Sequence, residues 1–237
     1  MSRLPLFCLP YAGGVAQNIY ARWQTLLPAH LQVLPLELAG HGRRMPEPFA
    51  DDMAEAAQDI CRQIAAALHG RKLWALYGHS MGALLAAEVL AQVNAAGLPA
   101  PHTCFLSGRN PPHAPLSRAP IHDLPQAEFL ERIRALGGTP QQFFEIPELV
   151  EIFLPVLRSD YRLVETWAGR ASHHCSPARL VFFQSDADPL LNPVLLPEWQ
   201  QYSSQPLQIE HFAGDHFFLQ PQAAQLCARI AAHLPAA

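Results

Sequence analysis

The chain has 237 residues, half of them hydrophobic and 15% charged, with a formal net charge of −4. This length and apolar content suit the core of a single α/β domain. The acidic balance argues against nucleic acid or an anionic membrane surface as a general partner, because proteins bind both through an excess of basic residues.

Short apolar runs alternate with helical patterns along the chain. The runs that predict strands cover residues 4–9, 33–38, 73–77, 103–106, 180–184 and 207–212. Apolar residues recur at helical spacing from Met53 to Leu68, and again after the third run as far as Gly97. This alternation is typical of a mostly parallel sheet with helices on both faces. We therefore predict an α/β fold in one domain that spans residues 1–237.

Residues 110–176 interrupt the alternation, because they contain no convincing strand pattern. A Pro-rich stretch opens this segment, and helical patterns follow over residues 125–136 and 147–167. Such a long strand-free segment inside an α/β sheet predicts a helical insertion that lies over one end of the sheet as a lid. The Gly137-Gly138 pair would let the two halves of the lid move, although an ordinary helix end also explains it.

Residues 78–82 read Gly-His-Ser-Met-Gly, between the third apolar run and the helical pattern after it. In that context, Gly-x-Ser-x-Gly is typical of the nucleophile elbow of α/β hydrolases. The glycines let strand and helix approach closely, and the helix N-terminus directs free amides toward any anion that forms there. We therefore predict an α/β-hydrolase fold in which Ser80 is the nucleophile.

A serine hydroxyl needs a base, and the base needs an acid partner. In α/β hydrolases the acid follows the serine along the chain, in a loop at a strand end. Residues 185–189, directly after a predicted strand, read Ser-Asp-Ala-Asp-Pro. We favour Asp188, at the far end of this turn, as the acid, and expect Asp186 to cap the turn.

The base is expected last in this order, after the strand at residues 207–212. There, residues 213–218 read Ala-Gly-Asp-His-Phe-Phe. His216 follows a Gly-Asp turn at the strand end, whereas His211 lies within the strand pattern. We therefore predict His216 as the general base.

Acyl transfer also needs hydrogen-bond donors for the oxyanion. One is expected to be the backbone amide of Met81, directly after the nucleophile, and another should come from the loop after the first strand. Residues 10–14 in that loop read Pro-Tyr-Ala-Gly-Gly. We favour the amide of Tyr11 as the second donor, with Ala12 as the alternative; a simple glycine turn would also explain the loop.

Further segments form a more specific pattern than the elbow alone. They are Leu9 to Gly14, Tyr20, Trp23, Gly40 to Arg44, Glu47-Pro48, residues 78–82, Leu154 to Asp160, Asp186 to Pro189, Trp199 and Gly214 to Leu219. With these segments, in order over nearly its whole length, the chain resembles the type II thioesterases of polyketide and nonribosomal peptide biosynthesis. It departs from that family at residues 39–43, which read Ala-Gly-His-Gly-Arg where relatives often read Pro-Gly-Arg.

The resemblance implies a discrete editing enzyme that hydrolyses acyl thioesters from the phosphopantetheine arm of acyl or peptidyl carrier proteins. It implies Ser80, Asp188 and His216 as the triad, and Met81 and Tyr11 as oxyanion donors. We expect no metal or redox cofactor, no nucleic-acid or membrane partner, and a monomer.

Two other interpretations remain open at this stage. An esterase or peptidase could use the same scaffold, because a triad does not define its leaving group. A hydrolase-like binding module is disfavoured, because it predicts a missing triad member while serine, acid and base all stand in the expected order.

Basic residues suggest where a carrier protein would dock. The chain has a single lysine, and its other basic residues are arginines. Arginine suits bidentate contacts with phosphate, and carrier proteins are typically acidic. Solvated helix faces explain these side chains equally well. The arginines in or near the predicted lid are Arg109, Arg118, Arg132, Arg134, Arg158 and Arg162.

The expected compartment is the cytoplasm. No run approaches the ~18 uncharged apolar residues of a membrane span, and residues 1–9 lack a basic segment with a cleavage site. The five cysteines are widely spaced and odd in number, which fits reduced thiols better than a disulfide framework.

Overall fold

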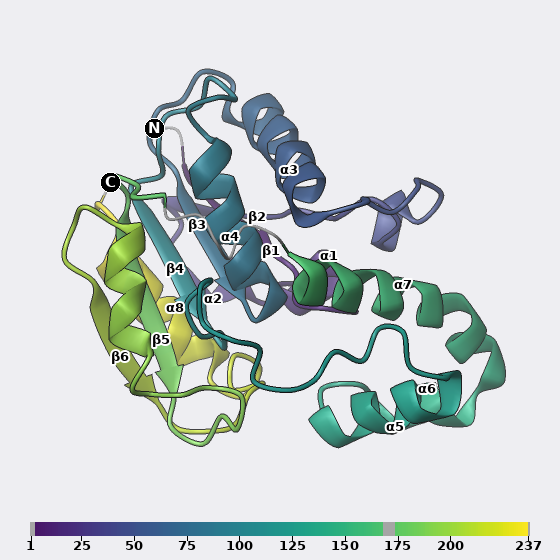
Figure 1. The fold of residues 1–237 in the computed structure, drawn as a ribbon. Helices are drawn as coiled ribbons and strands as arrows, with labels where there is room; N and C mark the ends of the chain where they lie inside the picture. The colour runs from purple at the N-terminus through teal and green to yellow at the C-terminus, as the bar shows by residue number, and fades with distance from the viewer. Residues whose placement is uncertain (1–2, 168–173, 237) are drawn as a thin grey trace.

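The computed structural model of the protein describes residues 3–167 and 174–236. Its centre is a six-stranded sheet in the order β2-β1-β3-β4-β5-β6, in which every neighbouring pair is parallel (Figure 1). The predicted parallel sheet is therefore confirmed. The strands are β1 (Leu4–Leu9), β2 (Leu31–Pro35), β3 (Ala75–His79), β4 (Thr103–Ser107), β5 (Arg179–Ser185) and β6 (Gln208–Phe212).

β2 begins and ends earlier than the apolar run at residues 33–38 predicts. It is an edge strand whose pairing with β1 runs from Leu31 to Pro35. Proline has no N–H group, so it favours the end of a strand. Leu36 and Leu38 are nevertheless buried, in the loop beyond the strand. The apolar run therefore indicated burial correctly but not strand pairing.

β3 lies two residues later than the run at 73–77 predicts. Leu73 is 44% exposed, whereas the strand continues through Gly78 and His79 as far as the predicted nucleophile. Parallel pairing with β4 extends to His79 and Ser107. The elbow is therefore the direct continuation of a central strand.

Helices cover both faces of the sheet. α3 (Met53–Leu68) and α4 (Met81–Gln92) pack side by side on one face (Figure 1). Short helices α1 (Ala16–Ile19) and α2 (Trp23–Leu26) lie on the other face with α8 (Ala223–Ala232). Alternate residues of β1 enter the two cores, because successive side chains of a strand point to opposite faces.

The strand order creates a switch point between β1 and β3. From β1 the chain crosses to β2 on one side, and then returns past β1 to β3 on the other. The connections after β1 and after β2 therefore cover opposite faces. In open parallel sheets, ligands bind at such a switch point, beyond the carboxyl ends of the strands. The Tyr11 loop and the Ser80 elbow both begin there.

Residues 110–167, called the helical segment below, lie between β4 and β5 and hold α5 (Gln126–Leu136), α6 (Gln141–Glu145) and α7 (Pro147–Thr166). The helices predicted at 125–136 and 147–167 are confirmed. α6 was not predicted, because five residues are too few to show a helical period. Residues 168–173 of the predicted insertion 110–176 lie outside the described residues, and its role as a lid stays a prediction.

The helical segment has its own small core, and polar contacts join the stretch before α5 to α7. Phe129 and Phe143 are among the buried residues of that core. The carboxylate of Glu165 accepts hydrogen bonds from the backbone amides of Ile121 and His122. Near the end of α7, the indole of Trp167 donates to Glu88 of α4 at 2.9 Å. The segment is therefore anchored to the main domain at this end.

Other features of the described residues bear on the sequence expectations. The five cysteines are free, and Cys175 is the exposed one among them. None of the helices in the described ranges combines the length and apolar character that crossing a membrane requires. Within the same ranges, no group of three or more His, Cys, Asp or Glu side chains is placed to hold a metal ion.

We expect Gly78→Ala to destabilise the fold strongly. A Cβ atom at residue 78 would lie 2.1 Å from the carbonyl oxygen of Gly82 and 2.9 Å from the amide nitrogen of Ala83. Both atoms belong to the backbone, so no flexible side chain can move aside. The free energy of unfolding should fall by about 3 kcal/mol or more, which urea denaturation would measure.

Gly97→Ala is the matched control. A Cβ atom there meets nothing within 4 Å, but Gly97 has a φ of +70°. The expected cost is therefore only the backbone strain of about 1–2 kcal/mol. A Gly78→Ala variant as stable as Gly97→Ala would contradict the close approach of β3 and α4.

Candidate active site

Ser80 connects the end of β3 to the first residue of α4 and has an unusual backbone conformation. Its φ is 55° and its ψ is −114°, a region that costs a non-glycine residue about 1–3 kcal/mol. The surroundings enforce it. The amide of Ser80 donates to the carbonyl oxygen of Ser107 at 2.9 Å. On the other side, an added Cβ at Gly82 would lie 2.8 Å from the carbonyl oxygen of Pro10.

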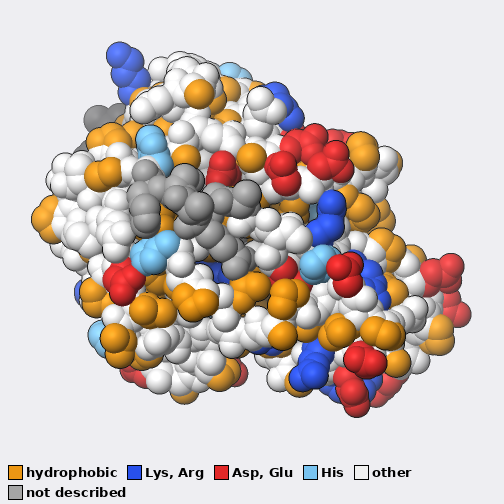
Figure 2. Space-filling model, in the orientation of Figure 1, with side chains coloured by type: hydrophobic (Ala, Val, Ile, Leu, Met, Phe, Trp, Pro, Cys, Tyr) orange, Lys and Arg blue, Asp and Glu red, His pale blue; other side chains and the backbone are white. Residues whose placement is uncertain are grey.

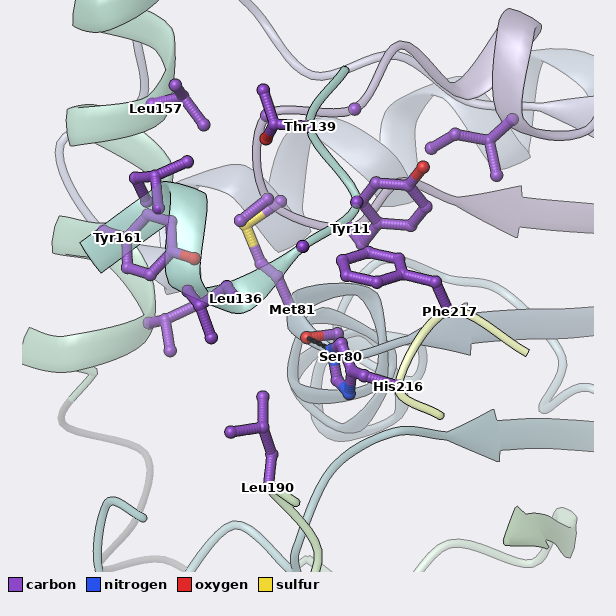
Figure 3. Close-up of a pocket in the computed structure, with 18 of the residues that line it drawn as sticks. Tyr11, Ser80, Met81, Leu136, Thr139, Leu157, Tyr161, Leu190, His216 and Phe217 are labelled. Atoms are coloured by element: carbon purple, nitrogen blue, oxygen red, sulfur yellow. Dashed lines mark hydrogen bonds between the residues drawn. The ribbon is translucent and has the colours of Figure 1, made fainter. Parts of the chain in front are cut away.

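The structure brings Ser80, His216 and Asp188 together from three separate loops. His216 Nε2 lies 3.1 Å from Ser80 Oγ, and His216 Nδ1 lies 2.7 Å from Asp188 Oδ2. Figure 3 shows the serine and the histidine facing each other at the base of a pocket. The three residues predicted from loop order therefore form one continuous hydrogen-bonded chain.

The hydrogen-bond partners determine which nitrogen of His216 carries the proton. Asp188 and His216 are 8% and 6% exposed, respectively. A carboxylate only accepts hydrogen bonds, so His216 must donate from Nδ1 to Asp188. In the neutral ring, Nε2 is then an acceptor, aimed at the hydroxyl of Ser80. This is the arrangement in which an imidazole can take a proton from serine.

Asp186 and His211 are positioned away from this chain, as the sequence prediction required. They pair with each other at 2.8 Å, with side chains that are 55% and 62% exposed. Asp186 was expected to cap its turn. In the described residues, Asp188 makes the contact of that kind instead: its Oδ1 accepts from the amide of Leu190 at 2.9 Å. Asp188 therefore both orients the histidine and fixes its own turn.

The loop after β1 forms a tight turn beside the serine. The amide of Gly14 donates to the carbonyl oxygen of Tyr11 at 2.9 Å, and the amide of Gly13 donates to Asp160 of α7 at 2.7 Å. Neither glycine amide is therefore available to an oxyanion. The amides of Tyr11 and Ala12 stay the candidates, opposite that of Met81. Tyr11, Ala12 and Met81 all line the pocket around Ser80.

His79, one residue before the predicted nucleophile, is a buried neighbour that the loop order does not predict. Its Nδ1 lies 2.9 Å from the hydroxyl of Ser107, and its ring centroid lies 4.8 Å from that of His216. Burial, followed by the proximity of His216, lowers its pKa well below the ordinary value. His79 is therefore neutral, and its uncharged ring packs against the ring of His216. The only sequence signal was its place inside the elbow.

A cavity of about 520 Å³ opens above the serine. Figure 3 shows Tyr11 and Phe217 on one side of Ser80, Leu190 on another, and Leu157 and Tyr161 facing it from α7. Most of the lining is apolar, as in pockets that enclose small organic groups. Its apolar side chains include Leu116, Ile133, Leu136, Phe143, Leu149, Phe153 and Val164.

The helical segment touches the loop of His216 at one glycine. Gly138 has a φ of +78°, and an added Cβ would lie 2.1 Å from the ring of Phe217. That ring in turn packs edge-on against Tyr11 (5.5 Å between centroids) and His216 (5.0 Å). The turn between α5 and α6 is thus in contact with the residue next to His216. The Gly137-Gly138 pair was considered in the sequence only as a hinge or a helix end.

Comparisons with known proteins agree with this geometry. A family model described as a thioesterase domain matches residues 4–234. A Brevibacillus parabrevis protein named linear gramicidin dehydrogenase LgrE is 36% identical over 233 residues, which cover 95% of this chain and 85% of that protein. Thioesterase PikA5 of Streptomyces venezuelae is 31% identical over 233 residues, which cover 98% of this chain and 82% of that protein.

A solved structure extends the likeness to three dimensions. The crystal structure of ClbQ, from the colibactin NRPS/PKS pathway, has a TM-score of 0.90 and 32% sequence identity with this chain. The match covers 98% of this chain and 97% of that one. The resemblance predicted from the sequence is therefore confirmed at the level of the family and the fold.

The strained backbone of Ser80 leads to a prediction about stability. Glycine adopts a positive φ without the steric cost that Cβ imposes. Ser80→Gly should therefore unfold at a higher temperature than Ser80→Ala, by an amount equivalent to about 1 kcal/mol. Calorimetry of the two variants measures the difference. Equal stabilities would contradict the idea that packing holds residue 80 in a strained conformation.

Proposed function

Because this chain belongs to the thioesterase family, we propose that it hydrolyses acyl thioesters on the phosphopantetheine arm of acyl or peptidyl carrier proteins. In this role it edits a polyketide or nonribosomal peptide synthase by removing stalled or aberrant acyl groups. One observation carries the proposal: Ser80, His216 and Asp188 are joined by hydrogen bonds, and Ser80 lies at the base of an apolar cavity. The thioesterase PikA5 and the NRPS/PKS pathway protein ClbQ support the pathway type.

Acylation follows from the positions of the three side chains. Ser80 Oγ attacks the thioester carbonyl carbon while its proton passes to His216 Nε2, 3.1 Å away. The imidazolium that forms is stabilised by Asp188, which is buried beside it. The carbonyl oxygen becomes an oxyanion, for which we propose the amides of Met81 and Tyr11 as donors. The carbon–sulfur bond then breaks, and the departing thiolate takes the proton from His216.

Deacylation uses the same groups in reverse. A water molecule gives a proton to His216 and attacks the acyl-serine carbonyl, again through an oxyanion. The tetrahedral intermediate releases Ser80, which recovers its proton from His216, and the free acid leaves. Every proton in both steps passes through His216, so the chemistry requires no metal or redox cofactor. A thiol is a good leaving group, which is why a thioester suits this site.

A hydrolytic reaction fits the site better than the dehydrogenation named for LgrE. Hydride transfer relies on a nicotinamide or flavin held next to the substrate. A serine, a histidine and a buried aspartate joined by hydrogen bonds supply a nucleophile and a base, which acyl transfer needs and hydride transfer does not. An oxygen-ester hydrolase is the nearer alternative, because the same triad would serve it.

We propose that the helical segment acts as a lid that encloses the acyl group. α5 and α7 supply apolar residues to the cavity wall, including Ile133, Leu157 and Tyr161. The acyl chain would lie among these side chains, while its carbonyl carbon sits at Ser80. The segment is anchored at the end of α7 through Trp167 and Glu88, so opening would involve the opposite end, around α5 and α6.

The contacts of the arginines narrow the proposed carrier-docking residues. Arg158 donates to the carbonyl oxygen of Leu124 at 2.7 Å, and Arg162 to that of Ala50 at 2.9 Å. Both therefore have structural partners. Arg132 is exposed on α5, and Arg118 lines the cavity. Acidic and basic side chains are mixed over this part of the surface (Figure 2), so we propose a few arginine contacts rather than a uniformly basic docking face.

Asp188→Asn should lower kcat by about 10³- to 10⁴-fold with little change in KM. An amide at this position would donate to His216 Nδ1 and hold the ring in the tautomer whose Nε2 carries the proton, which cannot take one from Ser80. Asp186→Asn, in the exposed pair with His211, is the matched control and should keep kcat within about twofold. Steady-state thioester hydrolysis compares them, and similar losses in both variants would contradict the role of Asp188.

The thioester proposal itself is tested with acyl groups loaded on a carrier protein. Wild-type protein should release short and medium acyl groups, and Ser80→Ala should release none above background, because it lacks the nucleophile. Mass spectrometry of the carrier arm measures the release. A matched series of oxygen esters with the same acyl groups is the control for leaving-group preference. Ser80-dependent cleavage of oxygen esters without any release from carriers would replace the proposal with the esterase alternative.

A further inference from the structure

A buried histidine–aspartate pair, His41 with Asp160, lies beside the loop after β1 and outside the triad. Asp160, on α7, is fully buried, and its Oδ2 lies 3.0 Å from His41 Nε2. The same oxygen accepts a hydrogen bond from the amide of Gly13 at 2.7 Å. Among the described residues, Asp160 Oδ1 is buried without a hydrogen-bond partner. Asp160 Oδ2 therefore joins three segments of the chain: α7, the loop after β1 and the loop after β2.

The partners of His41 show that its ring is charged. Its Nε2 faces the carboxylate of Asp160, and its Nδ1 lies 2.9 Å from the carbonyl oxygen of Ala39. Both partners only accept hydrogen bonds, so both ring nitrogens must donate. Only the imidazolium form carries two N–H groups. His41 is therefore a buried cation that neutralises the charge of Asp160.

The charges around His41 favour the same protonation state. Burial alone would lower the pKa of His41, but the charge and hydrogen bond of Asp160 outweigh it, and the carbonyl group of Ala39 and the charge of Glu37 add to them. The pKa of His41 is consequently raised. Glu37 itself is engaged by the backbone amides of Ala16 and Gln17, at 3.0 and 2.9 Å.

Asp160 connects α7, whose side chains line the cavity, with the loop after β1. Three residues before it on α7, Leu157 packs so closely on Gly13 that an added Cβ would lie 2.4 Å from Leu157 Cδ2. Leu157 and Tyr161 face the cavity from the same helix. Gly13 belongs to the turn that the hydrogen bond from Gly14 to Tyr11 closes. Fixing Gly13 therefore fixes the turn that carries the amides of Tyr11 and Ala12, the two candidates for the second oxyanion donor.

We propose that Asp160, held by the His41 cation, is a positioning residue that locks the Tyr11 turn against α7 and so places the second oxyanion donor. This inference rests on the proposed function, because it assigns a role in the same acyl transfer. Asp160 and His41 do not touch the substrate. They couple the position of α7, which the acyl chain contacts, to the donor that stabilises the transition state. Neutralising either residue should therefore slow the chemical step more than it weakens substrate binding.

The test compares Asp160→Asn with two substitutions of its partner, His41→Gln and His41→Arg. Removing an oxyanion donor costs about 10²–10³ in kcat, and a displaced donor should cost less. We therefore expect kcat to fall about 10- to 100-fold in Asp160→Asn and His41→Gln, with KM within about twofold. His41→Arg keeps a permanent cation opposite Asp160 and should retain most of the wild-type kcat.

Glu210→Gln controls for a general loss of stability. Glu210 pairs with His233 at 2.6 Å and with Arg229 at 2.7 Å, on β6 and at α8, so its loss removes a histidine–carboxylate pair that has no contact with the Tyr11 turn. This variant should melt at a lower temperature and keep the wild-type kcat. If Asp160→Asn does not fold, the comparison of His41→Gln with His41→Arg decides the question.

A pH profile adds a readout that a purely structural role would not move. The pair is complete while His41 is protonated, and its contribution is lost as the pH rises through the raised pKa of His41, above the ordinary value of about 6.5. The kcat of the wild type should therefore fall on the alkaline side, and His41→Arg should lack this fall. Unchanged kcat in both Asp160→Asn and His41→Gln, or the same alkaline fall in His41→Arg, would overturn the proposal.

The substrates separate this proposal from the proposed function. Each variant is assayed with one acyl group, presented both as a pantetheine thioester and as a p-nitrophenyl ester. Both reactions pass through the same oxyanion, so the ratio of variant to wild-type kcat should be similar for the two. Cleavage of the oxygen ester alone by the wild type would reject the thioester function, and the variant ratios on that ester would still decide the role of Asp160.

Discussion

The close approach of β3 and α4 at the elbow is the constraint on which the site depends. Gly78 and Gly82 leave space for backbone where any side chain would collide with main-chain atoms. This contact forces Ser80 into a backbone conformation that serine rarely adopts. The resulting turn presents the hydroxyl at the carboxyl end of the sheet, beside the switch point between β1 and β3. His216 and Asp188 come together with Ser80 because β5 and β6, the strands before them, end at the same edge of the sheet.

Much of the site could be predicted because parallel strands bring their following loops to one edge. The order serine, acid, histidine pointed to two loops, and position within each loop favoured Asp188 over Asp186 and His216 over His211. The geometry joins both choices to Ser80 through hydrogen bonds. The pair of His41 and Asp160 could not be found in this way, because it joins a loop after β2 to a helix far along the chain. No pattern in the sequence shows that these two residues meet.

Errors in the element boundaries have a similar origin. The apolar run that predicted β2 indicates which residues are buried, not which residues pair in the sheet. Leu36 and Leu38 are buried, but they do not belong to a strand. α6 has only five residues, so its helical period could not be recognised before its neighbours were placed. Local patterns thus predicted the core and the layers well, while contacts between distant segments determined where elements end and which charges meet.

Two glycines mark where the helical segment touches the loop after β1 and the loop of His216. Gly13 lies against Leu157, and Gly138 lies against Phe217. The rest of the segment's contribution to the cavity comes mostly from apolar side chains on α5, α6 and α7. The pocket is thus modular: its lining can diversify to accept acyl groups of other sizes while the two glycine contacts preserve the register with the reaction centre. A lineage of such enzymes, or a designer, could therefore change substrate range by exchanging side chains on one segment without rebuilding the catalytic machinery.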